Sequence, residues 1–434
     1  MTATLADALR QVTPDLDAKR RPRAGLDAWY PYYAGFSEAF ARSVLTKSCL
    51  SPGAVVMDPW NGSGTTTHVA DRLGFAAVGY DVNPVAALVA NAKLARPRDA
   101  EHVSGLARRI VTATLEDHDT CTTHPDPLLE WVRPSVARQY RRIESSVLAD
   151  LATGHSSQTL KVIDGTLPPL ASFLILALMR AARSLAAVET RTNPTWITPG
   201  EFPRGTRQML GSRWLAFVRQ MASELSLDGA SASARSESIV ADARSLPLAN
   251  ECVDFVLTSP PYCTRIDYVI NTSFELAAMG IGRGAPKFIQ LRERCMGAPL
   301  ARKGALSDPS TTWPDEIHAL LHAIRSHPSR DSSSYYYKTY WQYFSDCEMT
   351  LRELHRTLRQ TGAAVLVIQT SYYKDVRVDL PDLYVALGAA VGFRASVIST
   401  ANVKHSLTQI NSRSLRHRTT TTYREAVVAL EKNA

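Results

Sequence analysis

The sequence predicts an α/β fold in which short buried strands alternate with helices. Three apolar runs carry this prediction, at residues 54–57, 76–80 and 253–257. The first two are each followed by an acidic residue and a helix-like pattern, which is typical of a βαβ unit in a parallel sheet. At 434 residues the chain exceeds one typical core, so we expect one large domain with insertions, or two domains.

The first expected elements follow a polar N-terminal extension, residues 1–28. An aromatic cluster at 29–36 precedes a helix pattern over 37–45, with Ser37 in the N-cap position. Most of these rings suit core packing, and the alternative is that some of them, such as Tyr30 and Phe36, wall a ligand pocket.

A glycine loop follows the first strand, which ends at Asp58. The loop spans residues 59–67, Pro-Trp-Asn-Gly-Ser-Gly-Thr-Thr-Thr, and enters a helix pattern that reaches Leu73. Gly62 and Gly64 allow close backbone approach to a ligand, and the N–H groups at the helix start favour an anion such as a carboxylate. The spacing is neither the GxGxxG of dinucleotide sites nor a P-loop.

The second strand ends at Asp81, and the next residues lead into a helix over 85–94. An acidic residue that closes the second strand of a βαβ unit is placed to bind a ribose diol. Asp81 could also cap the helix, and the two roles are compatible. The unit as a whole predicts a site for an adenosine-containing cofactor.

Two basic stretches interrupt the alternation. Residues 96–235 are rich in Arg and Ala, with helical periodicity over 170–185 and 213–225, and predict a mostly helical insertion. Residues 280–334 form a second, irregular basic insertion. The first stretch contains arginines that could face a phosphate backbone or could simply be solvated: Arg138, Arg141, Arg142, Arg204, Arg207 and Arg213. The second contains Arg283, Lys287, Arg292, Arg294, Arg302 and Lys303.

Between these stretches lies the corner Thr258-Ser259-Pro260-Pro261-Tyr262. It follows a strand that ends near Asp242 and then the run 253–257. Two consecutive prolines cannot donate to a β-ladder or continue a helix, so the corner could be an ordinary strand terminator. Alternatively, the hydroxyl, the carbonyls and the ring could bind a planar amine and stack on the ring that carries it.

The C-terminal part continues the alternation. A helix is expected from residue 265 toward Met279, and an aromatic segment at 334–344 opens a long helix that ends at 360–362. A strand at 363–369, a helix at 380–391 and strands at 393–399 and 426–430 follow, with a polar, basic stretch at 402–424 before the last strand.

The composition is that of a soluble globular protein, 45% hydrophobic and 21% charged. The sequence contains neither a membrane-length apolar run nor a secretory core at its start, so we expect a cytoplasmic protein and no membrane partner. Six scattered cysteines argue against a disulfide framework or a zinc site of paired cysteines, and we expect no metal. The net charge of +8 mildly supports a nucleic-acid partner.

Two of these segments resemble motifs of one known family, the S-adenosyl-L-methionine-dependent amino methyltransferases of DNA. Residues 58–66 resemble its cofactor motif, DPFxGSGTT, with Trp60 in place of Phe, and residues 259–262 resemble its catalytic motif, [DNS]PP[YFW]. Residues 30–36 resemble the segment that closes over the methionine part of the cofactor. The cofactor motif comes first, which is the unpermuted arrangement.

The resemblance implies a Rossmann-like, doubly wound class I methyltransferase sheet formed by 29–95 and 236–434, with helical and irregular insertions. It also implies S-adenosyl-L-methionine, with Gly62 and Gly64 near the methionine carboxylate, Asp81 at the ribose and Asp242 near the adenine. Asp58 would orient the loop or the methionine ammonium. The expected cofactor-binding residues are Tyr30, Phe36, Asp58, Pro59, Trp60, Gly62, Gly64, Thr65, Thr66, Asp81 and Asp242, and the expected catalytic residues are Ser259, Pro260, Pro261 and Tyr262.

The Ser form of the catalytic motif is associated with cytosine-N4 methylation, so we expect methyl transfer to a flipped-out cytosine of double-stranded DNA. Adenine-N6 methylation of DNA and methylation of an RNA amino group are the alternatives, as is a catalytically idle DNA-binding regulator. We expect sequence specificity in the two basic stretches. A cognate restriction endonuclease or another defence-system protein is a candidate partner.

Overall fold

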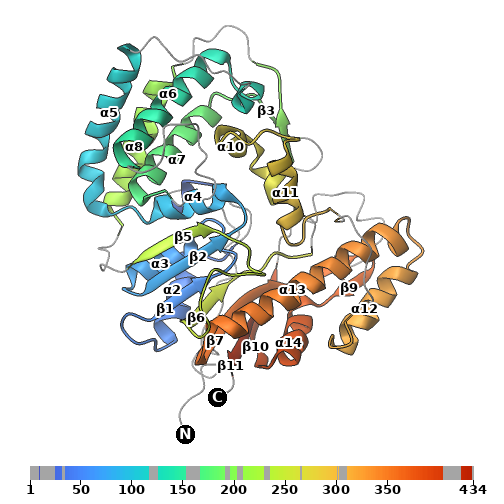
Figure 1. Cartoon of the computed structure of the whole chain (residues 1–434). Coiled ribbons are helices and arrows are strands. Elements are labelled where there is room, and N and C mark those ends of the chain that lie inside the picture. The colour runs from blue at the N-terminus through green and yellow to red at the C-terminus, as the bar shows by residue number, and fades with distance from the viewer. Residues whose placement is uncertain are drawn as a thin grey trace.

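A central seven-stranded sheet dominates the computed structural model, which describes residues 9, 25–31, 35–116, 126–152, 167–190, 196–202, 209–228, 235–263, 266–300, 302, 310–403 and 422–432. The strand order is β10-β11-β7-β6-β1-β2-β5 (Figure 1). All neighbouring strands are parallel except β11, which is antiparallel to both β7 and β10. The predicted Rossmann-like, doubly wound α/β fold is therefore confirmed. The strands are β1 (Val55–Asp58), β2 (Ala76–Asp81), β5 (Ser236–Val240), β6 (Val253–Thr258), β7 (Leu358–Gln369), β10 (Phe393–Val403) and β11 (Tyr423–Lys432).

The strand order reverses between β1 and β6. From β1 the chain builds outward through β2 to β5, and it then returns to place β6 and β7 on the other side of β1. In parallel sheets such a switch point leaves a crevice beyond the carboxyl ends of the two strands. Asp58 ends β1 and Thr258 ends β6, so the glycine loop and the Ser259 corner meet at this crevice.

Alternating side chains of the strands supply two cores, one on each face of the sheet. On one face α2 (Glu38–Lys47) and α3 (Thr65–Arg72) pack over Val56 and Val427. On the other, α12 (Asp315–Ser326), α13 (Tyr337–Thr357) and α14 (Leu380–Val391) pack over Met57 and Val428. Successive residues of a strand point to opposite faces, which is why neighbours in sequence join different cores. As predicted, Ser37 caps α2, since its Oγ accepts from the Phe40 N–H at 3.1 Å.

A third core lies in the helices at the top of Figure 1. The helices expected over 170–185 and 213–225 are confirmed as α7 (Pro169–Arg183) and α8 (Leu210–Ser226). They pack with α4 (Pro84–Lys93), α5 (Ala100–Glu116), α6 (Pro134–Leu151) and α10 (Ser273–Ala278). The stretch also contains a small hairpin of β3 (Val188–Thr190) and β4 (Ile197–Pro199), and the second basic stretch contains α11 (Pro286–Arg294).

Two predicted boundaries are wrong. The long helix α13 ends at Thr357 rather than at 360–362, because Leu358 already pairs with Val253 of β6 and begins strand β7. The helix expected from residue 265 toward Met279 is two short helices, α9 (Tyr268–Asn271) and α10. A second hairpin, β8 (Ser371–Tyr373) with β9 (Val376–Val378), follows β7, and β10 and β11 extend beyond their predicted ranges because they pair along their whole length.

Arg141 does not face a phosphate backbone. Its Nη2 and Nε donate to the two oxygens of Asp126 at 2.7 and 2.9 Å, and its Nη1 donates to Glu144 Oε2 at 2.9 Å. Nη1 and Nη2 also reach the carbonyls of Ala278 and Ala277, so Arg141 joins α6 to α10. The hydrogen bonds explain the side chain's burial, and the sequence alone could not have separated it from its exposed neighbour Arg138.

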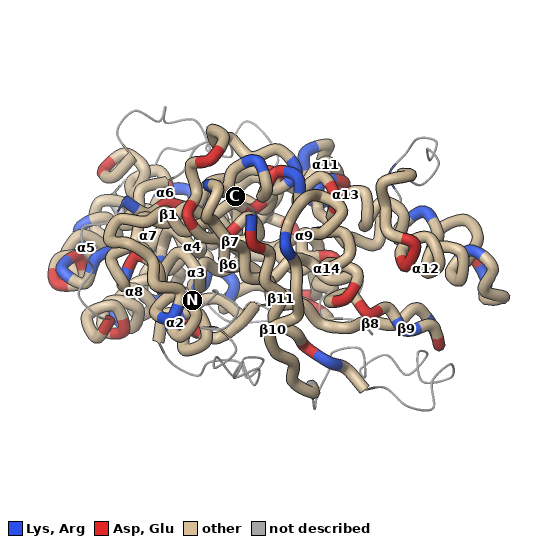
Figure 2. Tube along the Cα trace, turned by 90° about the horizontal axis from the view of Figure 1, so that it is seen from below, with Lys and Arg blue, Asp and Glu red and all other residues tan. Residues whose placement is uncertain are grey.

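Most of the other described basic residues singled out in the two basic stretches also bind groups of the protein itself. Arg292 pairs with Asp267, Arg294 with Asp242, and Arg302 with Asp346. Arg283 donates to the Ile197 carbonyl, and Arg213 to the Ser184 hydroxyl. Figure 2 shows acidic and basic positions interspersed along the described trace. Arg204, Arg207 and Lys303 lie outside the described residues, as does most of the N-terminal extension.

We expect Arg141→Ala to lower the free energy of unfolding by about 3–5 kcal/mol, because it leaves two partly or fully buried carboxylates without their cation. Arg138→Ala, from the exposed face of the same helix, is the control and should leave stability within about 0.5 kcal/mol. Urea unfolding of the three proteins at one pH measures both effects. Equal stabilities of the two variants would show that the buried ion pairs contribute little.

Candidate active site

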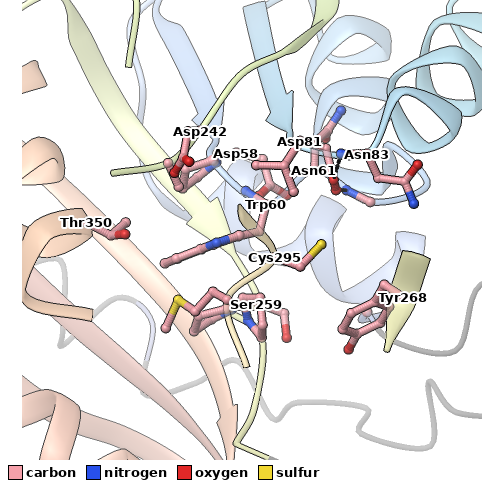
Figure 3. Close-up of a pocket in the computed structure, with 18 of the residues that line it drawn as sticks. Asp58, Trp60, Asn61, Asp81, Asn83, Asp242, Ser259, Tyr268, Cys295 and Thr350 are labelled. Atoms are coloured by element: carbon pink, nitrogen blue, oxygen red, sulfur yellow. Dashed lines mark hydrogen bonds between the residues drawn. The ribbon is translucent and has the colours of Figure 1, made fainter. Parts of the chain in front are cut away.

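The crevice at the switch point contains a pocket of about 990 Å³, open solvent at its mouth included. Figure 3 shows Asp58, Asp81 and Asp242, which end or follow three different strands, around the same space as Ser259. The expected site residues that line this pocket are Phe36, Asp58, Pro59, Trp60, Gly62, Thr65, Asp81, Asp242, Ser259, Pro260, Pro261 and Tyr262.

Asp58 connects the glycine loop to the strand that carries the Ser259 corner. Its Oδ1 accepts from Thr258 Oγ1 at 2.6 Å and from the Trp60 N–H at 3.1 Å. Its Oδ2 accepts from Thr66 Oγ1 at 2.7 Å. Burial raises the pKa of Asp58 to about 6, and these three donors hold it from rising further. The carboxylate therefore fixes the relative position of two loops.

Asp81 binds the backbone of the glycine loop. Its Oδ2 accepts from the Gly62 N–H at 3.1 Å, and its Oδ1 accepts from the Asn83 N–H at 2.8 Å. Burial raises the pKa of Asp81 to about 6 as well. The cap of α4 is Asn83, whose Oδ1 accepts from the Val85 N–H at 3.1 Å. Asp81 is therefore not the helix cap, and its carboxylate lines the pocket.

Three expected cofactor residues lie outside the pocket lining. Tyr30 is buried in the helical core rather than at the crevice. Thr66 is buried and donates to Asp58 and to the Leu257 carbonyl. Gly64 adopts a left-handed φ of 83°, and a Cβ there would lie 2.6 Å from the Cβ of Ala90. Helix packing against α4, rather than approach of a ligand, is what demands glycine at this position.

Asp242 is held by an arginine that sequence reasoning missed. Arg244 Nε and Nη2 donate to the two Asp242 oxygens at 2.9 and 2.7 Å, and its Nη1 donates to Asp346 of α13 at 2.8 Å. Burial acts to raise the pKa of Asp242, but the Arg244 hydrogen bonds and charge outweigh it and hold that pKa below its usual value. Arg244 thereby joins the loop after β5 to α13.

The Ser259 corner is oriented by the sheet and by α13. Ser259 Oγ donates to the Val367 carbonyl of β7 at 3.0 Å. The Pro261 carbonyl accepts from Tyr343 Oη of α13 at 2.9 Å. Burial raises the pKa of Tyr262 well above its usual value, with the nearby Glu425 as the next cause. These contacts determine which polar atoms of the corner remain for a ligand.

Comparison with known proteins agrees with this geometry. The model of the N6/N4 methyltransferase family, described as DNA methylase, matches residues 17–92. The Type II methyltransferase M.BsoBI of Geobacillus stearothermophilus is 22% identical over 417 residues, which cover 86% of this chain and 79% of that protein. These similarities support the expected relationship to the N4/N6 family of amino DNA methyltransferases. The same similarities support S-adenosyl-L-methionine as the methyl donor.

Further residues line the pocket without belonging to either motif. Tyr268 of α9, Cys295 after α11 and Thr350 of α13 surround it in Figure 3. Cys295 lies in the second basic stretch, Tyr268 precedes it and Thr350 follows it. No local sequence pattern marks these three residues. Asn61 and Asn83 lie inside or beside the predicted loops and could have been found from their position after a strand.

Among the described residues, no group of three or more His, Cys, Asp or Glu side chains is arranged to hold a metal ion. Within the same residues, no helix is both long and apolar enough to cross a membrane.

Proposed function

We propose that this methyltransferase transfers the methyl group of S-adenosyl-L-methionine to the N4 amino group of a flipped-out cytosine in double-stranded DNA. The observation that carries the proposal is the hydrogen bond from Ser259 Oγ to the Val367 carbonyl at 3.0 Å. Because the hydroxyl proton is committed to Val367, the lone pairs of Oγ are left to accept from an amine. The Ser form of the motif is the one that the resemblance associates with cytosine N4.

The pocket residues fit the cofactor by their chemistry. The Asp81 carboxylate has further lone pairs for ribose hydroxyls, since each oxygen accepts one described backbone N–H. Thr65 lies at the start of α3, where N–H groups favour the methionine carboxylate, and Gly62 lies in the loop before it. Phe36 and Trp60 supply apolar walls. The bound cofactor would supply an electrophilic sulfonium methyl group.

The corner then acts on the amine. An exocyclic amine conjugated with its ring is a poor nucleophile because its lone pair is delocalised. Hydrogen bonds from the two amino hydrogens to Ser259 Oγ and to the Pro260 carbonyl would favour a tetrahedral nitrogen. Tyr343 occupies the Pro261 carbonyl, and we find no partner for the Pro260 carbonyl among the described residues. Positioning, with Tyr262 stacked on the base, is the main catalytic contribution.

Nucleoside analysis tests the base assignment. DNA is incubated with the enzyme and methyl-labelled cofactor and is then digested, and we expect the label in N4-methylcytosine. The same reaction with Ser259→Ala is the control for a contaminating activity. Label confined to N6-methyladenine would overturn the base assignment, and label in RNA but not in duplex DNA would overturn the substrate. Cofactor binding without turnover would indicate an idle regulator.

We further propose that the enzyme acts in the cytoplasm as the modification partner of a restriction endonuclease or another defence protein. The similarity to a Type II methyltransferase supports this context. We also propose that residues 96–235 and 280–334 provide sequence specificity. For the second stretch, support comes from α11 and the loop after it, which border the pocket. Exchanging either stretch should change the methylated sequence while cofactor affinity persists.

A further inference from the structure

A buried glutamate of the last strand lies beside the Ser259 corner. Glu425 belongs to β11 and is only 3% exposed. It pairs in register with Gln369, the last residue of β7, and so lies at the pocket edge of the sheet. Its neighbour Arg424 points to α14, where it pairs with Asp379, and the alternation of the strand turns Glu425 to the opposite face.

Glu425 belongs to a chain of polar contacts that includes Ser259. Tyr262 Oη donates to Glu425 Oε1 at 3.3 Å. The same Tyr262 oxygen lies 3.4 Å from Ser259 Oγ, close enough for either hydroxyl to donate to the other. Ser259 instead donates to the Val367 carbonyl at 3.0 Å. The carboxylate therefore decides where the Tyr262 proton points.

We propose that Glu425 is a positioning residue that keeps the Tyr262 hydroxyl from donating to Ser259. This inference rests on the proposed function of the corner as an amine acceptor. The Glu425 carboxyl oxygen accepts the phenolic hydrogen bond of Tyr262, so the Tyr262 proton points away from Ser259. Both lone pairs of Ser259 Oγ then remain for the target amine. The contact also fixes the plane of the Tyr262 ring on which the base stacks.

The chemistry of burial supports a functional role for Glu425. A carboxylate in the sheet interior costs several kcal/mol of desolvation unless hydrogen bonds compensate. Its neighbours Val427 and Val428 in β11 are apolar, so Glu425 is a buried polar side chain among apolar ones. Without Glu425, the Tyr262 hydroxyl would turn to the acceptor 3.4 Å away, Ser259 Oγ, and would occupy a lone pair that the amine needs.

Four variants test this proposal: Glu425→Ala, Glu425→Gln, Tyr262→Phe and the double variant Glu425→Ala with Tyr262→Phe. We expect Glu425→Ala to lower kcat by about 10- to 100-fold, while KM for the cofactor stays near the wild-type value. Glu425→Gln keeps an acceptor oxygen and should stay within about threefold of wild type. Tyr262→Phe keeps the stacking ring, so we expect its kcat to fall less than that of Glu425→Ala.

The double variant gives the decisive readout. Removing the phenolic hydroxyl frees Ser259 again, so the double variant should recover at least about half of the logarithmic loss in kcat of Glu425→Ala. A merely structural role for Glu425 predicts no such recovery. Any of three results would overturn the proposal. They are a wild-type kcat for Glu425→Ala, a kcat of the double variant no higher than that of Glu425→Ala, and a loss of kcat in Glu425→Gln as large as that in Glu425→Ala.

Folding and base choice are controlled separately. Thermal unfolding and cofactor affinity are measured for every variant, and Glu425→Met, which keeps the side-chain volume, replaces Glu425→Ala if the alanine variant unfolds. The same kcat ratios then decide the proposal. The methylated base is identified in digests of wild-type product, so an incorrect base assignment would appear there and not in the ratios among variants.

Discussion

Ser259→Ala is expected to lower kcat by about 10²- to 10³-fold and to leave cofactor affinity near the wild-type value. The variant removes an acceptor aimed at the reacting amine, but it touches none of the groups that hold the glycine loop. Single-turnover methyl transfer and calorimetric cofactor titration separate the two effects. Cofactor affinity that fell in parallel with kcat would show that the corner shapes the cofactor pocket instead.

Two further substitutions at Ser259 test whether its side chain must both donate and accept a hydrogen bond. The Val367 carbonyl needs a donor at this position, since Ser259 Oγ donates to it at 3.0 Å. An asparagine amide can donate to Val367 and still accept from the amine, whereas an ionised aspartate can only accept. We therefore expect Ser259→Asn to retain about tenfold more activity than Ser259→Asp, from one hydrogen bond of about 1.5 kcal/mol. The reverse order would contradict this assignment.

Asp58→Ala is expected to lower both the free energy of unfolding and cofactor affinity. It leaves the Trp60 N–H and the Thr258 hydroxyl without their described acceptor, while Thr66 can still donate to the Leu257 carbonyl. The stability loss should be about 2–4 kcal/mol, and cofactor affinity should fall at least about tenfold because the glycine loop loses its anchor. Urea unfolding and calorimetric titration at pH 7.5 measure the two effects.

Asp58→Asn is the matched variant, because its amide can satisfy the same partners. The amide oxygen accepts from Trp60 and Thr258, and the amide N–H can donate to Thr66 Oγ1, whose own proton then goes to Leu257. We expect this variant to fold and to lose less cofactor affinity than Asp58→Ala. A loss as large as that of the alanine variant would mean that Asp58 binds the methionine ammonium directly.

The pH dependence of the Asp58→Asn comparison has a definite sign. Burial raises the pKa of Asp58 from 3.8 to about 6, so the native state binds the proton more tightly than the unfolded state. The stabilising contribution is full below about pH 4 and is lost as the pH rises through about 6. Wild type should therefore lose up to about 3 kcal/mol relative to Asp58→Asn between pH 4 and pH 7.5. Unfolding curves that stay parallel across this range would contradict the raised pKa.

The sequence by itself determined the fold class, the sheet edge at which the site lies and the residues of both motifs. These are local features: a strand, the acidic or Ser-Pro-Pro residue that ends it and the loop that follows are contiguous in the chain. Parallel strands place their carboxyl ends at one edge, so Asp58, Asp81 and Ser259 had to meet there. The helical periodicity of α7 and α8 is also a local pattern, so the sequence predicted both helices.

The tertiary structure alone decided which polar atoms of the site are engaged and which are left for ligands. Arg244 reaches Asp346 across 102 positions, Ser259 reaches Val367 across 108, and Tyr262 reaches Glu425 across 163. Such contacts depend on strand order, register and strand face, because a shift of one residue in β11 would turn Glu425 to the other face. Gly64 belongs here too, since the need for glycine arises from Ala90 of a different helix.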